Sequence, residues 1–120
     1  MLISSFGRNI SPEWVESELL SFRFFSQAVV VGDDRPSCAA LLMPVEVEVS
    51  DALIQREVDR VNEGLPDYAR VRQWLRMRKP LTVGNGMLTD NGRLRRPQIY
   101  EQYAEELDEI YSIHEEYIAL

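Results

Sequence analysis

Cysteine, histidine and long apolar runs are scarce in this chain of 120 residues, and each scarcity excludes a class of protein. Cys38 is the only cysteine, so no disulfide forms within the chain and we expect a reducing compartment, the cytoplasm. His114 is the only histidine, which excludes the usual zinc-ligand spacing and argues against a Cys–His nucleophilic pair. We interpret both residues as structural and expect no metal site. No stretch approaches the roughly 20 apolar residues that cross a bilayer, and residues 1–6 do not resemble a targeting segment.

Phosphate-binding signatures are missing as well. The chain has no loop of the Gly-x-x-x-x-Gly-Lys-Ser/Thr type, and residues 84–86, which precede no helix, are interpreted as a hairpin turn. The formal net charge of −7 argues against nucleic acid as a partner, because binding to its phosphates requires a dominant basic field. Basic residues nevertheless gather in segments 70–79 and 93–96, which leaves room for a small polyanionic ligand.

The length fits one folded domain over residues 1–120 with a single core. Hydrophobic residues make up 45% of the chain and charged residues 28%, values typical of globular rather than disordered proteins.

The N-terminal part predicts a short apolar segment followed by a helix. Leu2–Phe6 is partly apolar and is broken at Gly7. Ser11 and Pro12 are a typical N-cap and first helical residue. The apolar residues expected on the buried face of this helix are Val15, Leu19 and Phe22.

A hairpin and a second helix follow in the pattern. The apolar runs 28–31 and 39–43 flank turn-forming residues, which predicts a hairpin covered on both faces. Ser50 is the expected N-cap of the next helix, and Gly64 its end. Its expected core residues are Ile54, Val58 and Val61.

The last part of the chain is less regular until its final helix. Residues 68–77 fit either a short helix or a strand, and the pattern does not decide between them. Residues 81–83 predict a strand that ends at an Asn85-Gly86 turn. Pro97 should begin a final helix whose apolar face carries Ile99, Tyr103, Leu107 and Ile110. The elements together predict a single α+β domain.

Two segments resemble motifs of one enzyme superfamily. LISSFGRNISPEWVE (residues 2–16) combines a strand, a glycine loop and Pro-x-x-Val-Glu at a helix start, and NGMLTDNGRLRR (residues 85–96) carries a glycine followed by basic residues. They resemble the hinge-side and last core motifs of AMP-forming acyl-CoA synthetases, which belong to the adenylate-forming enzymes. The form Asn-Gly-x-Leu-Thr is similar to that of long-chain fatty acyl-CoA ligases. Segments 27–36 and 61–69 fit the same family in the same order, so the resemblance covers nearly the whole chain.

This resemblance implies that residues 1–120 are the C-terminal lid domain of such an enzyme and that the N-terminal adenylation domain is absent. The implied fold is α+β, with a small three-stranded sheet, flanking helices and a short N-terminal hairpin-like segment. Family members form an acyl-adenylate from ATP and a carboxylic acid, then transfer the acyl group to coenzyme A while the lid rotates. The implied cofactors are ATP/AMP and coenzyme A, with Mg²⁺ in the full enzyme, and none is held tightly by the lid. The implied partners are the adenylation domain, in cis or in trans, and through it a fatty acid; without that domain no activity is expected.

The resemblance also implies site residues. Gly7 and Arg8 match the loop that borders the coenzyme A tunnel, where a residue without a β-carbon lets a thin ligand pass. Without the resemblance, the sequence favours the simpler interpretation, in which Gly7 only supplies a turn before the helix and Arg8 is a solvated cation. The basic stretch 70–79 is either a charged outer face or a contact for coenzyme A phosphates, and Arg95 and Arg96 either begin a helix in solvent or contact phosphate.

Arg93 departs from the family motif because it occupies the position of the adenylation lysine. Arginine keeps the charge but replaces a compact ammonium by a planar fork. Arg93 therefore replaces the lysine at reduced rate, or the protein keeps only the thioester-forming role, or catalysis is lost. Two functions follow: the lid of a fatty acid–CoA ligase, or a non-catalytic lid that acts as an interaction or regulatory module.

Overall fold

The computed structural model describes the backbone of residues 1–119 and the side chains of residues 1–112. The His114 side chain lies outside the described residues, so its structural role stays a prediction. The chain forms two compact units, Met1–Met77 and the part that begins at Arg78, and each is described by itself. Within the described residues, no helix combines the length and the apolar character that crossing a membrane requires.

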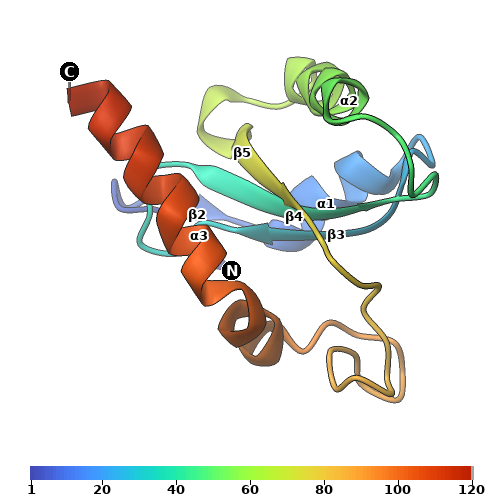
Figure 1. Cartoon of the computed structure of the whole chain (residues 1–120). Coiled ribbons are helices and arrows are strands. Elements are labelled where there is room, and N and C mark those ends of the chain that lie inside the picture. Colours follow the sequence, from blue (N-terminus) through green and yellow to red (C-terminus); the bar gives the residue numbers. More distant parts are fainter. Residues whose placement is uncertain (120) are drawn as a thin grey trace. The chain divides into compact units, whose positions relative to one another are not determined.

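The first unit is built on a three-stranded sheet with the order β3-β4-β5 (Figure 1). Strand β3 (Phe25–Val31) pairs antiparallel with β4 (Cys38–Pro44), and every residue of β4 is buried. The expected hairpin, covered on both faces, is therefore confirmed. Strand β5 (Val71–Arg76) pairs with β4 in parallel. Parallel neighbours need a crossover connection, which the helix between β4 and β5 provides.

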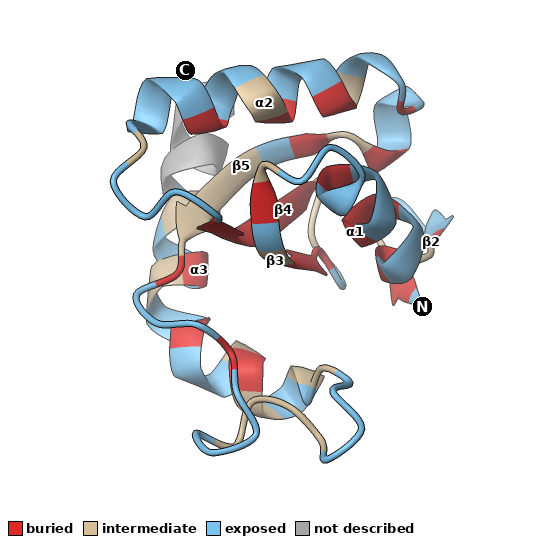
Figure 2. Cartoon of the chain, turned by 90° about the vertical axis from the view of Figure 1, so that its right-hand side faces the viewer, coloured by how far each residue is buried: buried red, intermediate tan, exposed pale blue. Residues whose placement is uncertain are grey.

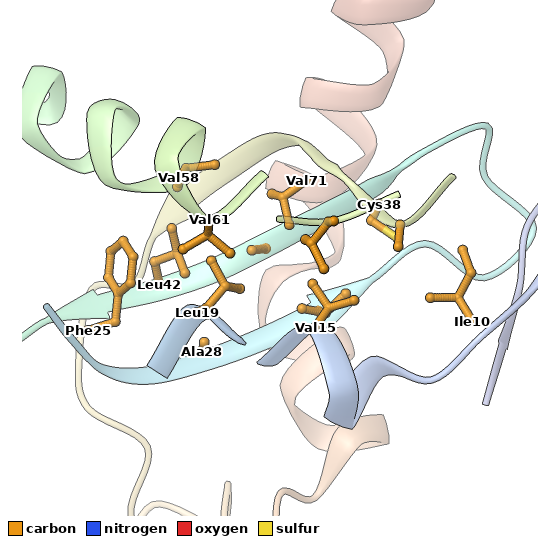
Figure 3. Close-up of a cluster of buried hydrophobic side chains, with 14 of the residues drawn as sticks. Ile10, Val15, Leu19, Phe25, Ala28, Cys38, Leu42, Val58, Val61 and Val71 are labelled. Atoms are coloured by element: carbon orange, nitrogen blue, oxygen red, sulfur yellow. The ribbon is translucent and has the colours of Figure 1, made fainter. Parts of the chain in front are cut away.

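Two helices cover one face of this sheet. Helix α1 (Pro12–Leu20) and helix α2 (Asp51–Glu63) begin as expected, because the Ser11 and Ser50 hydroxyls accept hydrogen bonds from backbone N–H groups of their first turns. Alternate residues of β3 and β4 form one hydrophobic cluster with residues of both helices (Figure 3). The cluster includes Val15, Leu19, Ala28, Val30, Ala40, Leu42, Ile54, Val58 and Val61.

The segment that the pattern left undecided is a strand. After α2 comes the 3-10 helix η1 (Asp67–Ala69), and β5 follows it. The Asn62 side chain donates to the Val71 carbonyl and accepts from the Val71 N–H group, each at 2.8 Å. These bonds fix the first residue of β5 against the end of α2, so a contact between distant residues decides the conformation.

The expected core position of Phe22 is wrong. Helix α1 ends at Leu20, and Phe22 is 61% exposed. The Arg60 guanidinium instead lies 3.8 Å from the centre of the Phe22 ring. The helical spacing of apolar residues in the sequence continues past Leu20, where the helix ends.

A small hairpin precedes α1 in the same unit, as expected. Strands β1 (Leu2–Ile3) and β2 (Asn9–Ile10) pair antiparallel, and Leu2 and Ile10 belong to the hydrophobic cluster. The residues between these strands form the glycine loop, defined here as residues 4–8.

The second unit contains an irregular loop and helix α3 (Arg96–Ala119). The strand expected at residues 81–83 is absent from the described structure. The Asn85 side chain accepts from the Thr82 N–H group and donates to the Pro80 carbonyl, so this segment folds onto itself instead of extending. On α3, Ile99, Tyr103 and Leu107 are buried as expected, while Ile110 is half-buried and Tyr111 is buried (Figure 2).

Candidate functional site

The glycine loop is closed by its own hydrogen bonds and open to solvent above Gly7. Ser4 N donates to the Arg8 carbonyl and Gly7 N to the Ser4 carbonyl, both at 2.9 Å. Gly7 has a φ of 80°, a backbone angle that residues other than glycine rarely adopt. A β-carbon placed there would find no heavy atom within 4 Å. The backbone at Gly7 is thus accessible to a thin ligand.

Arg8, the other residue implied for this loop, is also exposed and points over an aromatic ring. Its guanidinium carbon lies 4.1 Å from the centre of the Tyr68 ring. Such stacking orients the planar cation and leaves its edge available for hydrogen bonds. The pairing joins the glycine loop to η1, which is distant in sequence, and the sequence analysis did not predict it.

A hollow of about 340 Å³ lies beside Arg8 in the first unit. It is open, and its lining combines two aromatic residues, two arginines and a single carboxylate. The lining residues are Ser4, Phe6, Arg8, Pro36, Ser37, Asp67, Tyr68 and Arg72. Phe6 is 82% exposed, an unusual state for a large aromatic side chain. Aromatic faces with arginines are suited to an aromatic base that carries phosphate groups.

The basic stretch 70–79 is mostly engaged in internal contacts. Arg72 pairs with Asp67 at 2.5 Å, and Arg76 pairs with Asp51 at 2.8 Å while donating to two carbonyls. Arg78 pairs with Glu106. These partners favour a charged outer face for most of the stretch. Arg72 alone among them also lines the hollow beside Arg8.

Arg93 is exposed in a tight loop of the second unit. Leu88 and Leu94 form an isolated antiparallel bridge, and Thr89 N donates to the Arg93 carbonyl at 2.8 Å. The Thr89 hydroxyl accepts from Arg93 N at 3.0 Å, and Gly92 has a φ of 81°. This geometry places Arg93 opposite Thr89 beside the bridge, with its side chain exposed.

Arg95, next to this loop, forms hydrogen bonds within the second unit. Its guanidinium donates to the Gly86 carbonyl at 3.2 Å, and its N–H donates to the Met87 carbonyl at 2.9 Å. Residues 84–86 lie in a turn and precede no helix, as expected, but no strand flanks this turn in the described structure, so its interpretation as a hairpin is wrong.

One motif residue has a structural explanation that the sequence analysis missed. Glu16, the last residue of Pro-x-x-Val-Glu, is only 6% exposed. Its carboxylate accepts from the Val30 N–H group at 2.8 Å and so joins α1 to the C-terminal end of β3. The glycine loop, Pro12 and Glu16 follow one another at a fixed spacing in the motif. The Glu16 bond to β3 therefore also fixes the position of the loop relative to the sheet.

Cys38 is buried in β4 and is not a nucleophile. Burial removes the thiol from water and raises its pKa to about 11, so the reactive thiolate is scarce near neutral pH. This agrees with its interpretation as structural. Among the described residues, no group of three His, Cys, Asp or Glu side chains is placed to hold a metal ion.

Comparison with known proteins places this geometry in a family. A family model described as the AMP-binding enzyme C-terminal domain matches residues 1–115. The chain belongs to this family. The resemblance of its two motifs to adenylate-forming enzymes is thereby confirmed.

Curated relatives of this family member include fatty acid ligases. The chloroplastic long-chain-fatty-acid–acyl-carrier-protein ligase AEE15 of Arabidopsis thaliana is 27% identical over 122 residues, covering 92% of this chain and 16% of the ligase. The long-chain-fatty-acid–CoA ligase FadD15 of Mycobacterium tuberculosis is 23% identical over 136 residues, covering 93% of this chain and 22% of the ligase. The chain thus spans less than a quarter of either protein's length.

Solved structures share the fold. The adenylation domain of a carboxylate reductase from Mycobacterium chelonae matches with a TM-score of 0.82 and 25% identity, covering 92% of this chain and 19% of that one. An adenylation and carrier-protein didomain of a Segniliparus rugosus carboxylic acid reductase, in complex with AMP, matches with a TM-score of 0.83 and 23% identity, covering 96% and 18%. The expected α+β fold, with its small sheet and flanking helices, is confirmed as that of the C-terminal domain of adenylate-forming enzymes.

Proposed function

We propose that residues 1–120 are the lid of an AMP-forming fatty acid–CoA ligase, which closes over the acyl-adenylate site and rotates to admit coenzyme A. The observation that carries the proposal is that the family match spans residues 1–115 and that both motif loops, at Gly7 and at Arg93, are exposed. Exposed loops are available to a partner, whereas buried ones would have served only the lid's own packing. The cytoplasm is the proposed compartment.

The glycine loop supports the thiol-transfer role. Gly7 has open space above it, so a pantetheine arm can lie against the backbone without meeting a side chain. Arg8, oriented by Tyr68, offers a planar set of donors to a phosphate of coenzyme A. The hollow that Arg8 shares with Arg72 provides aromatic and cationic groups beside that path.

Arg93 supports a reduced adenylation role. During adenylation, negative charge gathers where the carboxylate attacks the α-phosphate, and a cation placed there stabilises the transition state. Arg93 supplies this charge from an exposed position in its loop. Its guanidinium is larger and more delocalised than an ammonium, so the fit to a site shaped for lysine is poorer and the step slower.

The remaining groups belong to the proposed partner. ATP/AMP and the fatty acid would be held mainly by an adenylation domain, in cis or in trans. Mg²⁺ would be held in the full enzyme, as the family resemblance implies. A lid alone buries too little of any of these ligands to hold them tightly.

Complementation tests the proposal. This chain is mixed with a fatty acid–CoA ligase core from which the lid has been deleted, and AMP release is measured with fatty acid, ATP and coenzyme A. We expect restored turnover that rises with the concentration of the chain. With the Arg93→Lys variant, the rate of AMP release should be about tenfold higher if the better-fitting cation stabilises the transition state by roughly 1.4 kcal/mol.

A second function is favoured by Arg93 itself. If the loss of the motif lysine marks a loss of catalysis, the chain is a non-catalytic lid that docks on a synthetase as an interaction or regulatory module. Under this function neither the chain nor its Arg93→Lys variant restores AMP release. The chain would instead bind the core and change the activity of an intact synthetase.

A further inference from the structure

The turn between β3 and β4, residues 32–37, forms hydrogen bonds to strand β1 and to the glycine loop. Asp34 N donates to the Ile3 carbonyl at 2.8 Å, and Ser5 N donates to the Arg35 carbonyl at 2.9 Å. The Asp33 carboxylate accepts from the Ile3 N–H group at 3.1 Å. Backbone groups alternate in direction along a strand, so these bonds occupy the edge of β1 that does not face β2.

The glycine loop needs such support because its own hairpin is short. Strands β1 and β2 have two residues each, and an isolated hairpin of this size is not stable in water. Leu2 and Ile10 anchor the base of the hairpin in the core. Beyond that base, hydrogen bonds from Ile3 and Ser5 to the turn tie the backbone of the hairpin and loop to the rest of the unit.

The turn itself is well fixed. It joins two strands of the core, and Arg35 N donates to the Gly32 carbonyl at 2.9 Å. Asp34 has a φ of 57°, a left-handed conformation that aspartate tolerates better than most residues. A β-carbon on Gly32 would meet the Ser37 carbonyl oxygen at 3.2 Å, so the backbone is closely packed here.

We propose that Asp33 is a positioning residue for the thiol-transfer step: through Ile3 it holds the glycine loop at the place where the pantetheine arm passes. Asp33 touches no substrate in this role. The inference rests on the proposed function of the glycine loop. It goes beyond that function because it assigns the loop's placement to a carboxylate that lies 30 residues away from Ile3 and outside both motifs.

The effect should fall on one half-reaction. The bonds of Asp33 and its turn reach Ile3 and Ser5, which belong to the first unit, whereas Arg93 belongs to the second. A loop that is displaced by loss of the Asp33 bond therefore meets the thiol arm poorly while the adenylation cation is unchanged.

The test compares Asp33→Ala with Asp33→Asn in the enzyme that joins this chain, in cis or in trans, to an adenylation core. Asparagine keeps the Oδ1 acceptor and alanine removes it. We expect Asp33→Ala to raise the KM for coenzyme A by about fivefold, the value of one hydrogen bond, with fatty-acid-dependent pyrophosphate exchange unchanged. Asp33→Asn should match the wild type. Glu48→Ala, which removes an exposed charge in another loop, serves as the charge control.

A structural readout accompanies the kinetics. In this chain alone, amide hydrogen exchange at Ile3 and Ser5 should be faster in Asp33→Ala than in Asp33→Asn, while exchange at Val30 in β3 stays the same. An alanine variant with unchanged KM overturns the proposal, as does an equal loss in both half-reactions or a failure of asparagine to retain the wild-type value.

A variant of the loop itself separates this inference from the proposed function. Gly7→Asn puts a side chain into the open space above the loop. If Gly7→Asn leaves thiol transfer unchanged, the proposed function of the glycine loop is wrong. If Gly7→Asn impairs thiol transfer and Asp33→Ala does not, only the positioning role of Asp33 is overturned.

Discussion

The guanidinium of Arg8 lies over the ring of Tyr68, 4.1 Å from its centre, so the cation beside Gly7 rests on an aromatic surface. Tyr68 comes from η1, which follows α2, whereas Arg8 comes from the N-terminal hairpin. The contact gives Arg8 one orientation at the edge of the hollow that it lines with Arg72. A solvated arginine would lose more side-chain entropy on binding a phosphate.

Replacing the ring tests this orientation. Tyr68→Leu should raise the KM for coenzyme A about two- to fivefold, because the exposed cation–π contact contributes roughly 0.5–1 kcal/mol. Tyr68→Phe keeps the ring and should behave as the wild type. Steady-state kinetics of the complemented enzyme check both variants. If phenylalanine and leucine have the same effect, the ring does not orient Arg8.

Glu16 should contribute to stability rather than to catalysis. Its carboxylate is buried and accepts the Val30 N–H bond, so Glu16→Ala leaves that donor without this partner. We expect a loss of about 1–3 kcal/mol in the free energy of unfolding, measured by urea denaturation. Glu16→Gln keeps an acceptor oxygen and should lose less. A Glu16→Ala protein as stable as the wild type would show that the bond to β3 is dispensable.

Cys38 should make stability fall at high pH. Burial raises its pKa from the ordinary 9.0 to about 11, so the folded state retains the thiol proton that the unfolded state releases first. Its stabilising contribution is therefore complete below pH 9 and is lost as the pH rises from 9 to about 11, by up to about 3 kcal/mol. Urea denaturation across this range should show the loss in the wild type and a smaller one in Cys38→Ala.

Thiol labelling gives an independent check on Cys38. At pH 8 a buried thiol with a raised pKa reacts slowly with an alkylating reagent, and denaturant should restore the rate of an ordinary thiol. Rapid labelling of the native chain at pH 8 would contradict the burial of this side chain in β4.

Local signals were sufficient for most of the first unit. Ser11 and Ser50 each cap the helix that follows, and the two apolar runs form the expected hairpin, because capping and continuous burial are encoded by neighbouring residues. The predicted core position of Phe22 and the predicted strand at residues 81–83 were wrong for related reasons. In each case a periodic or β-prone pattern continued past a point where the chain turns, at the end of α1 and at the Asn85 side chain.

The remaining features depend on contacts between distant residues. Residues 71–76 become a strand because Asn62 binds Val71 and β4 offers an open parallel edge. The motifs identified Gly7, Arg8 and Arg93 by resemblance, and the structure places all three at the surface. Tyr68 and Asp33 lie in segments that fit the family, but the sequence does not show their contacts, which form only once the hairpin lies beside η1 and the β3–β4 turn.

In the proposed function, the Gly7 loop serves thiol transfer and the Arg93 loop serves adenylation. The most direct measurement follows both half-reactions in one complemented enzyme carrying Gly7→Asn, since asparagine tolerates a positive φ and its side chain enters open space. We expect acyl transfer to coenzyme A to fall at least tenfold, a cost of about 1.4 kcal/mol, while fatty-acid-dependent pyrophosphate exchange is retained. Unchanged acyl transfer, or an equal fall in both half-reactions, would contradict it.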